Sequence, residues 1–439
     1  WDVFADWILT YGNTLRFPLW NETVILTADL GLINRIFVKE QLLYDKHMPT
    51  FGPFLPILGS GLVTSHGELW KRQRKIIGIG FVGDMLDLAM NRGYEAVERV
   101  MENMAEHQQR DEPIHLDEEF RRMAIQVIGQ AILSMDPKDC DRVFPDLYLP
   151  IVEEANRQTW WGFRKYLPLP EVLHANSCLK KLNAYVCNLL QERARDRAAQ
   201  GFRGSKNDVL DRIMDGCELS ESNPTLSKEQ TSQLCDEIKT FLLAGHETTA
   251  STLTWSLYEL MKNPDAMRRV REEADAMYGP GCQGVDKEKF KKGLQFTESV
   301  IRETLRLYSP VPMVTRTPNV DDTFDDITLP KGTWVSVMVR AVHLRPDLWP
   351  EPHVWRPDRF MPGGDANRNA FLPFTQGPRR CMGQYFSITE SKVVLSKLVQ
   401  RFDFTPTKGF TVKRHRYVVP VCPAEPFYVT VAPREGYQK

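Results

Sequence analysis

The stretch Phe374-Thr-Gln-Gly-Pro-Arg-Arg-Cys-Met-Gly383 carries more chemical information than any other part of the chain. Gly377 and Gly383 are expected to take positive φ angles and to let backbone segments approach closely. Cys381 lies where an amphipathic helix, expected over residues 382–402, begins. The free N–H groups and the dipole of a helix N-terminus favour an anion, so this pattern favours a thiolate at Cys381. The structural alternative is a buried, inert cysteine after a glycine-rich turn.

Composition limits the class of protein. The chain has 439 residues, 42% of them hydrophobic, which is enough for a large core. We find no linker, charge block or internal repeat, so we expect one domain over residues 1–439. The 56 basic and 57 acidic side chains leave a net charge of −1, which gives no general attraction for nucleic acid or anionic lipid.

The cysteines and the apolar runs bear on the compartment. Eight cysteines, at positions 140, 178, 187, 217, 235, 282, 381 and 422, form no CxxC pair, which argues against a disulfide framework and for a reducing compartment. No run of about 18 apolar residues is present, so no transmembrane helix is expected. The chain starts at Trp1 without a methionine and soon enters a strand pattern, so we expect that an upstream anchor or targeting segment is missing.

Hydrophobic periodicity predicts a helix-rich chain with small sheets. Strands are expected over residues 14–20, 23–27, 333–339, 417–421 and 427–431, and helices over residues 68–77, 117–134, 179–200, 297–307 and 382–402. The clearest helix begins at Ser227-Lys-Glu-Gln230, a capping box, and ends before Asn263-Pro264. Its ~35 residues make it far longer than an average globular helix.

The middle of this long helix reads Ala244-Gly-His-Glu-Thr-Thr249, and Gly and Thr are poor helix formers. Local conflicts of this kind often mark functional positions. A Gly-Thr kink that relieves packing is the structural alternative. His246 could be taken for a metal ligand, but we favour a packing or hydrogen-bonded histidine because it points away from Ala244 and Thr248.

Two further pairs share a helix face. Glu303 and Arg306 are three residues apart, and Trp70 and Arg74 are one helical turn apart. Taken alone, the first pair could be a solvated ion pair and the second could belong to a basic surface helix.

Together these motifs resemble the cytochrome P450 family. FTQGPRRCMG agrees with the pattern F-x-x-G-x-R-x-C-x-G at every fixed position, and Ala244–Thr249 resembles A-G-x-[DE]-T-T. Glu303–Arg306 resembles the E-x-x-R motif, and Pro357-Asp-Arg359-Phe360 resembles P-x-R-F, in the family's order. Asp358 and Trp355 are minor departures. The resemblance extends from about Tyr11 to the end and implies a mainly α fold with small sheets and a long central helix over a haem.

The resemblance also implies roles for individual residues. Cys381 would be the axial iron ligand, and a thiolate in that position favours O–O cleavage. Glu247 and Thr248 would relay protons through ordered water. The residues expected around haem b are Trp70, Arg74, Ala244, Arg316, Phe374, Arg379, Cys381 and Gly383, with Ala244 and Gly245 leaving room for oxygen and substrate. Glu303, Arg306 and Arg359 would form a structural triad.

The implied activity is that of a haem-thiolate monooxygenase, which inserts one oxygen atom of O2 into an apolar small molecule by hydroxylation or epoxidation. Electrons would come from NADPH through a separate reductase-type or ferredoxin-type donor, with Lys71, Arg72, Lys75 and Arg380 as a basic patch for an acidic partner. We expect a monomer that binds no nucleic acid and associates with the endoplasmic reticulum membrane, or alternatively with a plastid or other organelle membrane. The alternatives are a haem-thiolate isomerase or dehydratase, which would not need Glu247 and Thr248, and a non-catalytic haem sensor.

The substrate pocket is the least defined part. Candidates by resemblance are Phe51, Phe54, Leu58, Phe241, Val311, Met313, Val314 and Val419, although each of them could be an ordinary core residue. Trp160-Trp161, followed by Arg164-Lys165, could lie at a membrane interface or form an aromatic pair inside the protein.

Overall fold

The computed structural model describes residues 2–19, 22–81, 85–201, 208–215, 225–279, 284–407 and 420–436. The chain forms two compact units. Unit 1 contains Trp1–His47, Leu86–Met123 and Thr248–Lys439, and unit 2 contains Met48–Met85 and Ala124–Glu247. The single domain expected over residues 1–439 stays a prediction.

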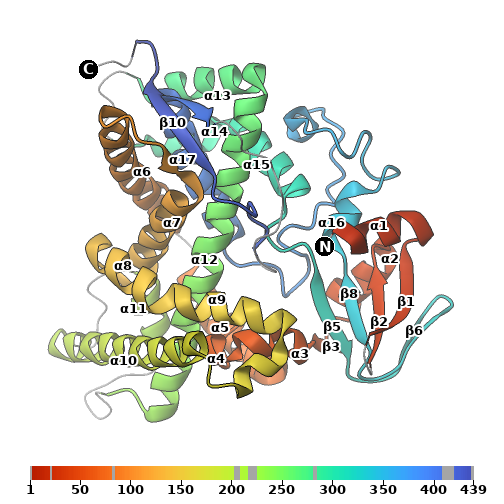
Figure 1. The fold of residues 1–439 in the computed structure, drawn as a ribbon. Coiled ribbons are helices and arrows are strands. Elements are labelled where there is room, and N and C mark those ends of the chain that lie inside the picture. Colours follow the sequence, from red (N-terminus) through yellow and green to blue (C-terminus); the bar gives the residue numbers. More distant parts are fainter. Residues whose placement is uncertain are drawn as a thin grey trace. The chain divides into compact units, whose positions relative to one another are not determined.

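Unit 1 is organised around a five-stranded sheet (Figure 1). Its strand order is β1 (Thr14–Leu19), β2 (Glu22–Thr27), β8 (Trp334–Val337), β5 (Val314–Pro318) and β3 (Tyr44–Lys46). The hairpin expected over residues 14–27 is confirmed, with Thr14 opposite Thr27, and residues 20 and 21 between its strands lie outside the described residues. Strand β2 pairs in parallel with β8, which joins the start of the chain to a segment about 300 residues later.

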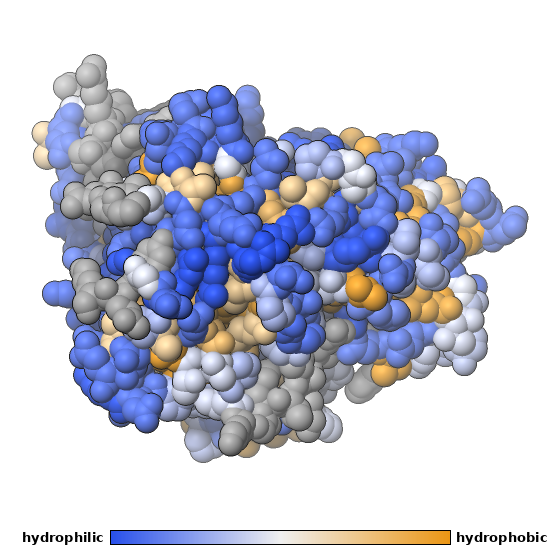
Figure 2. Space-filling view, turned by 90° about the horizontal axis from the view of Figure 1, so that it is seen from above, coloured by the Kyte–Doolittle hydropathy of each residue, from blue (hydrophilic) through white to orange (hydrophobic). Residues whose placement is uncertain are grey.

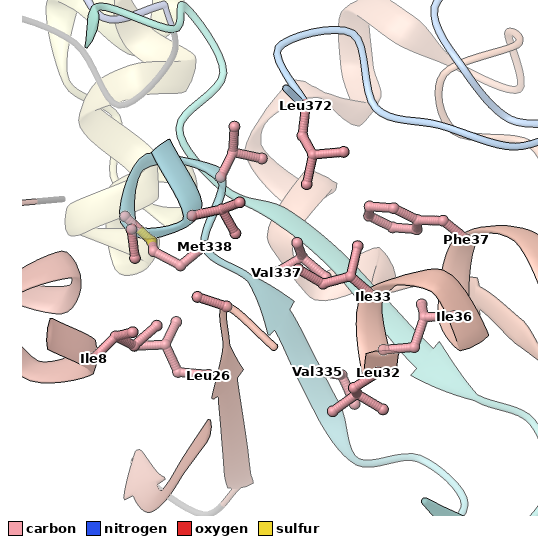
Figure 3. Close-up of a cluster of buried hydrophobic side chains, with 14 of the residues drawn as sticks. Ile8, Leu26, Leu32, Ile33, Ile36, Phe37, Val335, Val337, Met338 and Leu372 are labelled. Atoms are coloured by element: carbon pink, nitrogen blue, oxygen red, sulfur yellow. The ribbon is translucent and has the colours of Figure 1, made fainter. Parts of the chain in front are cut away.

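A core of aliphatic side chains fills one face of this sheet (Figure 3). It lies among the sheet, α1 (Asp2–Tyr11), α2 (Leu30–Asn34) and α16 (Val339–Leu344). Ile8, Leu26 and Val335 are almost completely buried, and each contributes roughly 1.5–3 kcal/mol of transfer free energy. Leu372 enters the same core close to Phe37. The segment that precedes the cysteine motif is therefore anchored in this core.

The remaining helices of unit 1 pack near the C-terminal part of the chain. They are α6 (Met85–Gln109), α13 (Pro264–Met277), α14 (Lys287–Lys292), α15 (Gln295–Leu307) and α17 (Gln384–Arg401). A small sheet has the order β4 (Ile114–His115), β10 (Tyr428–Pro433) and β9 (Phe402–Pro406), and β6 (Asp322–Phe324) pairs with β7 (Ile327–Leu329). Helix α17 packs against both α13 and α15, so the helix that follows the cysteine is buried along most of its length.

Unit 2 is helical wherever its secondary structure is described. It contains α3 (Met48–Phe51), η2 (Gly52–Phe54), α4 (Leu55–Leu58), α5 (Gly67–Gly80), α8 (Pro137–Val143), η3 (Phe144–Tyr148), α9 (Leu149–Trp160), η4 (Gly162–Tyr166), α10 (Pro170–Ala199) and α11 (Val209–Asp215). The helix expected over residues 179–200 begins earlier, at Pro170, because proline is well suited to the first helical turn.

Two helices are divided at an internal position between the units, α7 (Leu116–Leu133) and α12 (Lys228–Lys262), and α6 belongs to unit 2 only through its first residue, Met85. The 35-residue helix predicted from the capping box is confirmed as α12. The Ser227 N–H donates to Oε1 of Gln230 at 2.8 Å, and the Gln230 N–H donates to Oγ of Ser227 at 3.1 Å. These reciprocal bonds satisfy two donors at the helix end.

One predicted strand is wrong where it can be checked. Of residues 417–421, only Pro420 and Val421 are described, and neither is in a strand. The carbonyl of Val421 instead accepts hydrogen bonds from the Trp255 indole at 3.0 Å and the Ser251 hydroxyl at 2.5 Å. Side chains of α12 thus donate to a carbonyl group that would accept from a neighbouring strand if this segment were part of a sheet.

One face of the molecule is mainly polar (Figure 2). Figure 2 shows one face on which hydrophilic residues predominate and hydrophobic residues appear as separate patches. No helix in the described part of the chain is both long enough and apolar enough to cross a membrane.

Candidate functional site

The cysteine loop, residues Phe374–Gly383, is held in shape by its own backbone. The Cys381 N–H donates to the Phe374 carbonyl at 2.9 Å, which closes the loop. Gly377 has φ +76°, and a Cβ atom at this position would lie 2.0 Å from the carbonyl oxygen of Phe37. Only glycine permits both this backbone conformation and this close approach.

Gly383 does not behave as expected. Its φ is −78°, so the predicted positive φ is wrong at this position, and it serves as the N-cap residue of α17. A Cβ atom here would meet only the Cys381 Sγ, at 3.9 Å, which is an ordinary contact. Its carbonyl accepts the Ser387 N–H at 2.8 Å, which begins the helical hydrogen bonding.

Cys381 is exposed, whereas every other cysteine in the described ranges is buried or half-buried. This exposure contradicts the alternative of a buried, inert cysteine. Cys381 lies three residues before Gln384, the first residue of α17, in the position expected to favour a thiolate. Phe374 is half-buried in the same loop.

Glu303, Arg306 and Arg359 lie together in the interior of unit 1. Arg306 makes two hydrogen bonds of 2.8 Å to the Glu303 carboxylate, and Arg359 donates to the same carboxylate at 3.2 Å. All three side chains are fully buried. The alternative of a solvated surface ion pair is therefore excluded for Glu303 and Arg306.

His343, which the sequence analysis did not single out, connects these charges to the cysteine loop. Its Nε2 accepts the Leu372 N–H at 2.9 Å, so Nδ1 carries the proton and donates to the Arg306 carbonyl at 2.9 Å. The Leu372 carbonyl in turn accepts the Thr375 N–H at 3.0 Å. No motif in the sequence marks His343, because its partners lie 29 and 37 residues away.

Two arginines are buried near the cysteine loop. Burial, together with repulsion from Arg379, lowers the pKa of the Arg316 guanidinium to about 9. Burial also lowers the pKa of Arg379, although the Asp45 carboxylate, 3.5 Å from Nη2, partly opposes this. Arg316 lies over the Phe37 ring at 5.1 Å. Two cations thus share the neighbourhood of one carboxylate, and a further anion would stabilise them.

The family model for Cytochrome P450 matches residues 1–431. The chain belongs to the cytochrome P450 family. A cytokinin hydroxylase of Arabidopsis thaliana is 27% identical, covering 99% of this chain and 82% of its own length. Cytochrome P450 97B1, chloroplastic, of Pisum sativum is 28% identical, covering 89% of this chain and 79% of its own length. The solved structure of retinoic acid bound cyanobacterial CYP120A1 has a TM-score of 0.82 at 25% identity, covering 98% of this chain and 93% of that one.

These findings confirm the predicted fold class, mainly α with small sheets, and the predicted enzyme class. The protein is a cytochrome P450 monooxygenase, and the family implies haem iron as its cofactor. The residues of unit 1 fit this group. Cys381 offers an exposed thiol at a helix N-terminus, and the buried pair Arg316 and Arg379 offers two cations suited to the anionic propionates of haem.

The middle of α12 has one open face. Ala244 is exposed and Thr248, one turn later, is half-buried, although most of the residues around them are buried. Gly245 points elsewhere, because a Cβ atom there would lie 2.7 Å from Cγ1 of Ile128 on α7. Its small size therefore serves helix packing rather than leaving room for oxygen and substrate, which corrects the expectation for this residue.

Glu247 is buried beside His246. His246 Nδ1 lies 2.6 Å from the Leu242 carbonyl, and its Nε2 lies 3.2 Å from Oε1 of Glu247. The expectation of a hydrogen-bonded histidine is confirmed. Because a carbonyl oxygen can only accept, Nδ1 carries a proton and donates it to the Leu242 carbonyl. Tyr148 packs edge-on against the His246 ring at 5.3 Å.

On α5, Trp70 is buried and Arg74 is half-buried. Lys71, Arg72 and Lys75 are exposed on the same helix, and Arg380 is exposed on the cysteine loop. The basic patch composed of these four residues stays a prediction, because α5 belongs to unit 2 and the loop to unit 1.

The pocket candidates fall into three groups. In unit 2, Leu58 and Phe241 are buried, whereas Phe51 and Phe54 are half-buried in short helical turns. In unit 1, Val311 is half-buried, and Met313 and Val314 pack against the core of Figure 3. Val419 lies outside the described residues. A cavity of about 380 Å³ in unit 2 lies between α5 and α12, and it is lined by none of these candidates.

The segment after Leu58 lies directly on α12. The Ser60 N–H donates to the Asp236 carboxylate and the Leu62 N–H to the Glu237 carboxylate, both at 2.9 Å. A Cβ atom on Gly61 would lie 2.2 Å from the Thr240 hydroxyl. No sequence motif marks this attachment, although Gly59 and Gly61, on either side of Ser60, are a signal of close backbone approach.

Proposed function

We propose that this P450 hydroxylates or epoxidises an apolar small molecule, with haem b held through Cys381. Electrons come from NADPH through a separate reductase-type or ferredoxin-type donor. The observation that carries this proposal is the exposed Cys381 in a loop fixed by Gly377, by its own backbone bonds and by the His343 connection. Haem bound to a thiolate supplies the activation of dioxygen.

The residues around the loop have separate tasks in this proposal. Cys381 supplies the anionic sulfur, and the N-terminus of α17 favours its negative charge. Arg316 and Arg379 bind the propionates, together with Trp70 and Arg74. Phe374 and Gly383 adjoin the ligand. Glu303, Arg306 and Arg359 bind no substrate but hold the region of the loop in place.

Proton delivery falls to the centre of α12. Thr248 is half-buried in the middle of the helix, and Oε1 of Glu247 lies 3.2 Å from Nε2 of His246. A carboxyl group and an alcohol in this order can pass protons through ordered water. His246 is a positioning residue in this scheme, because its ring contacts the Glu247 carboxylate.

Two variants test this mechanism. Cys381→Ser should abolish the absorbance of the reduced, carbon monoxide-bound thiolate complex, and Thr248→Ala should retain that absorbance but yield more hydrogen peroxide and less product per NADPH. Thr254→Ala is the matched control, since its hydroxyl donates to the Ala250 carbonyl of the same helix at 2.9 Å. A histidine-type spectrum in the native protein would refute thiolate ligation, and unchanged coupling in Thr248→Ala would refute the relay.

The substrate is proposed to be apolar and of small to medium size. Supporting this, Leu58 and Phe241 are apolar and lie on neighbouring parts of unit 2, with Phe241 5.7 Å from the Phe81 ring. The related cytokinin hydroxylase and retinoic acid complex indicate small organic ligands. A screen by haem absorbance, scored by the low-spin to high-spin shift, should identify compounds that bind. If only charged, polar compounds cause the shift, the proposal is wrong.

Membrane association is proposed on an exposed aromatic segment. Trp160, Trp161, Phe163 and Tyr166 are 58–78% exposed at the end of α9 and in η4, and Lys165 lies beside the Tyr166 ring. Trp and Tyr favour the boundary between lipid and water. The endoplasmic reticulum is the proposed location, with a plastid membrane as the alternative. Phospholipid vesicles should shift the tryptophan fluorescence of the native protein to shorter wavelength, and a Trp160→Ser/Trp161→Ser variant should lose most of the shift. Equal shifts in both proteins would contradict this site.

A further inference from the structure

Two cysteines of unit 2 lie in contact across a helix crossing. Cys187 on α10 and Cys235 on α12 are 48 residues apart in sequence, and their Sγ atoms are 3.0 Å apart. Both are free thiols. A disulfide has an S–S bond of about 2.05 Å, so the sulfurs need to approach by only about 1 Å.

A polar contact fixes the same crossing one turn away. Lys239, four residues after Cys235, donates to the Asn183 side chain at 2.9 Å, and Asn183 precedes Cys187 by four residues. Lys239 also lies 3.1 Å from Asp236. Because this contact sets the position of α10 along α12, the sulfurs are held together before any oxidation.

The two thiols differ in access to solvent. Cys235 is only 5% exposed, whereas Cys187 is half-buried. Burial, followed by the contact with Cys187, raises the pKa of Cys235, while the charge of Lys239 opposes this. An oxidant in solution therefore reaches the Cys187 sulfur first, with Cys235 behind it as the second thiol.

We propose that Cys187 and Cys235 are a redox-responsive pair that forms a disulfide between α10 and α12 when the protein meets hydrogen peroxide. The Cys187 thiolate attacks one oxygen of the peroxide, so that an S–O bond forms, the O–O bond breaks, and the leaving hydroxide takes up a proton to become water. Cys235 then attacks the oxidised sulfur, an S–S bond forms, the S–O bond breaks, and a second water leaves. Overall, two thiols and one peroxide give one disulfide and two waters.

The cross-link joins α10 to the half of α12 that also holds the segment after Leu58. Asp236 and Glu237, which bind the Ser60 and Leu62 N–H groups, directly follow Cys235. The oxidised protein therefore has α10, α12 and this segment tied at one place.

Peptide mapping tests the pair directly. The reduced holoprotein is treated with graded hydrogen peroxide, its free thiols are blocked with N-ethylmaleimide, and unreduced peptides are analysed by mass spectrometry. The expected product is a peptide linking Cys187 to Cys235, which dithiothreitol reverses. It should be absent in Cys187→Ser and in Cys235→Ser, and present in Cys178→Ser, a control on the same helix α10.

Amide hydrogen exchange gives a second readout. Oxidation should slow exchange at least threefold in residues 183–190 of the native protein but leave Cys187→Ser unchanged. The proposal is overturned if both thiols stay fully alkylated under peroxide, if Cys187 reaches the sulfinic acid without a cross-link, or if exchange in α10 does not respond to the cross-link.

Discussion

At the scale of single residues, Gly377 and Gly383 show that two glycines of one motif can have different physical tasks. Gly377 combines a left-handed backbone with an approach to the Phe37 carbonyl that excludes any side chain. Gly383 has a φ of −78°, which any residue can adopt, and it is the N-cap residue of α17. The position of the Cys381 sulfur therefore depends on Gly377 more than on Gly383.

The first prediction compares these two positions. Gly377→Ala should lower the free energy of unfolding by at least about 2 kcal/mol, because a left-handed backbone is unfavourable for alanine and the new Cβ collides with backbone. It should also reduce the fraction of protein that gives the thiolate–carbon monoxide absorbance. Gly383→Ala, measured in the same way by thermal unfolding, should cost less. Equal losses would contradict the steric argument.

At the scale of elements, α15 is the helix that connects the buried charges to the cysteine loop. Glu303 and Arg306 of this helix form a buried cluster with Arg359. His343 donates to the Arg306 carbonyl and accepts the Leu372 N–H, which links this cluster to the segment before the cysteine loop. A buried ion pair is weak evidence for stability in itself, but removal of one partner leaves uncompensated buried charge. The elements that hold the loop should therefore be sensitive to charge removal and to acid.

Glu303→Gln should destabilise the protein by about 3–5 kcal/mol, because two buried guanidinium groups lose their shared anion. The matched control is Glu288→Gln, which breaks an exposed pair with Lys291 and should change stability by no more than about 0.5 kcal/mol. Urea unfolding followed by circular dichroism measures both. A Glu303→Gln loss as small as that of the control would refute the structural role of this carboxylate.

His343 predicts a dependence on pH. Burial, with the nearby Arg306 charge, lowers its pKa from 6.5 to about 3 in the folded protein. The unfolded chain therefore binds an additional proton below pH 6.5, and stability falls as the pH drops from 6.5 toward about 3. This residue should remove about 2 kcal/mol between pH 6.5 and about pH 5.

The comparison is between native protein, His343→Gln and His353→Gln, an exposed histidine. His343→Gln should be less stable near pH 7.5 but should lose less stability on acidification, whereas His353→Gln should follow the native curve. Urea midpoints across the pH range give the answer. Parallel curves for all three proteins would show that His343 is not the acid-sensitive group.

At the scale of the whole molecule, the net charge of −1 means that attraction to a charged partner must come from a local group of residues. The exposed Lys71, Arg72 and Lys75 on α5 are the candidates in unit 2. An acidic electron donor would be guided by such charges, and the effect would weaken with salt.

Lys75→Glu should therefore slow reduction of the haem by an acidic reductase several-fold at low ionic strength, with a smaller effect at high salt. Lys181→Glu, at an exposed site on α10, is the control for net charge. Stopped-flow absorbance at several salt concentrations measures the rate. Identical salt profiles for the two variants would remove α5 from the proposed partner surface.

Local sequence was sufficient for much of this protein. The capping box at Ser227 and the Asn263-Pro264 stop predicted both ends of α12, because helix ends are set by side chains a few residues away. The motif around Cys381 and the E-x-x-R and P-x-R-F motifs led to the family that the whole-chain match shows. The hairpin over residues 14–27 was also predicted correctly, because its two strands are close together in the sequence.

Other features were decided only by tertiary contacts. The Val421 carbonyl accepts hydrogen bonds from side chains of α12 instead of from a strand. The close approach of Ile128 leaves no room for a side chain at position 245. His343 hydrogen-bonds both the Arg306 carbonyl and the Leu372 N–H. The contact between Cys187 and Cys235 likewise depends on a crossing of two helices 48 residues apart. By itself, the sequence determined the ends of α12, the hairpin and the chemical identity of the thiolate motif, since these depend on short-range backbone and side-chain preferences. Packing decided which distant groups form hydrogen bonds, ion pairs or sulfur contacts, because no local sequence pattern encodes a partner across the core.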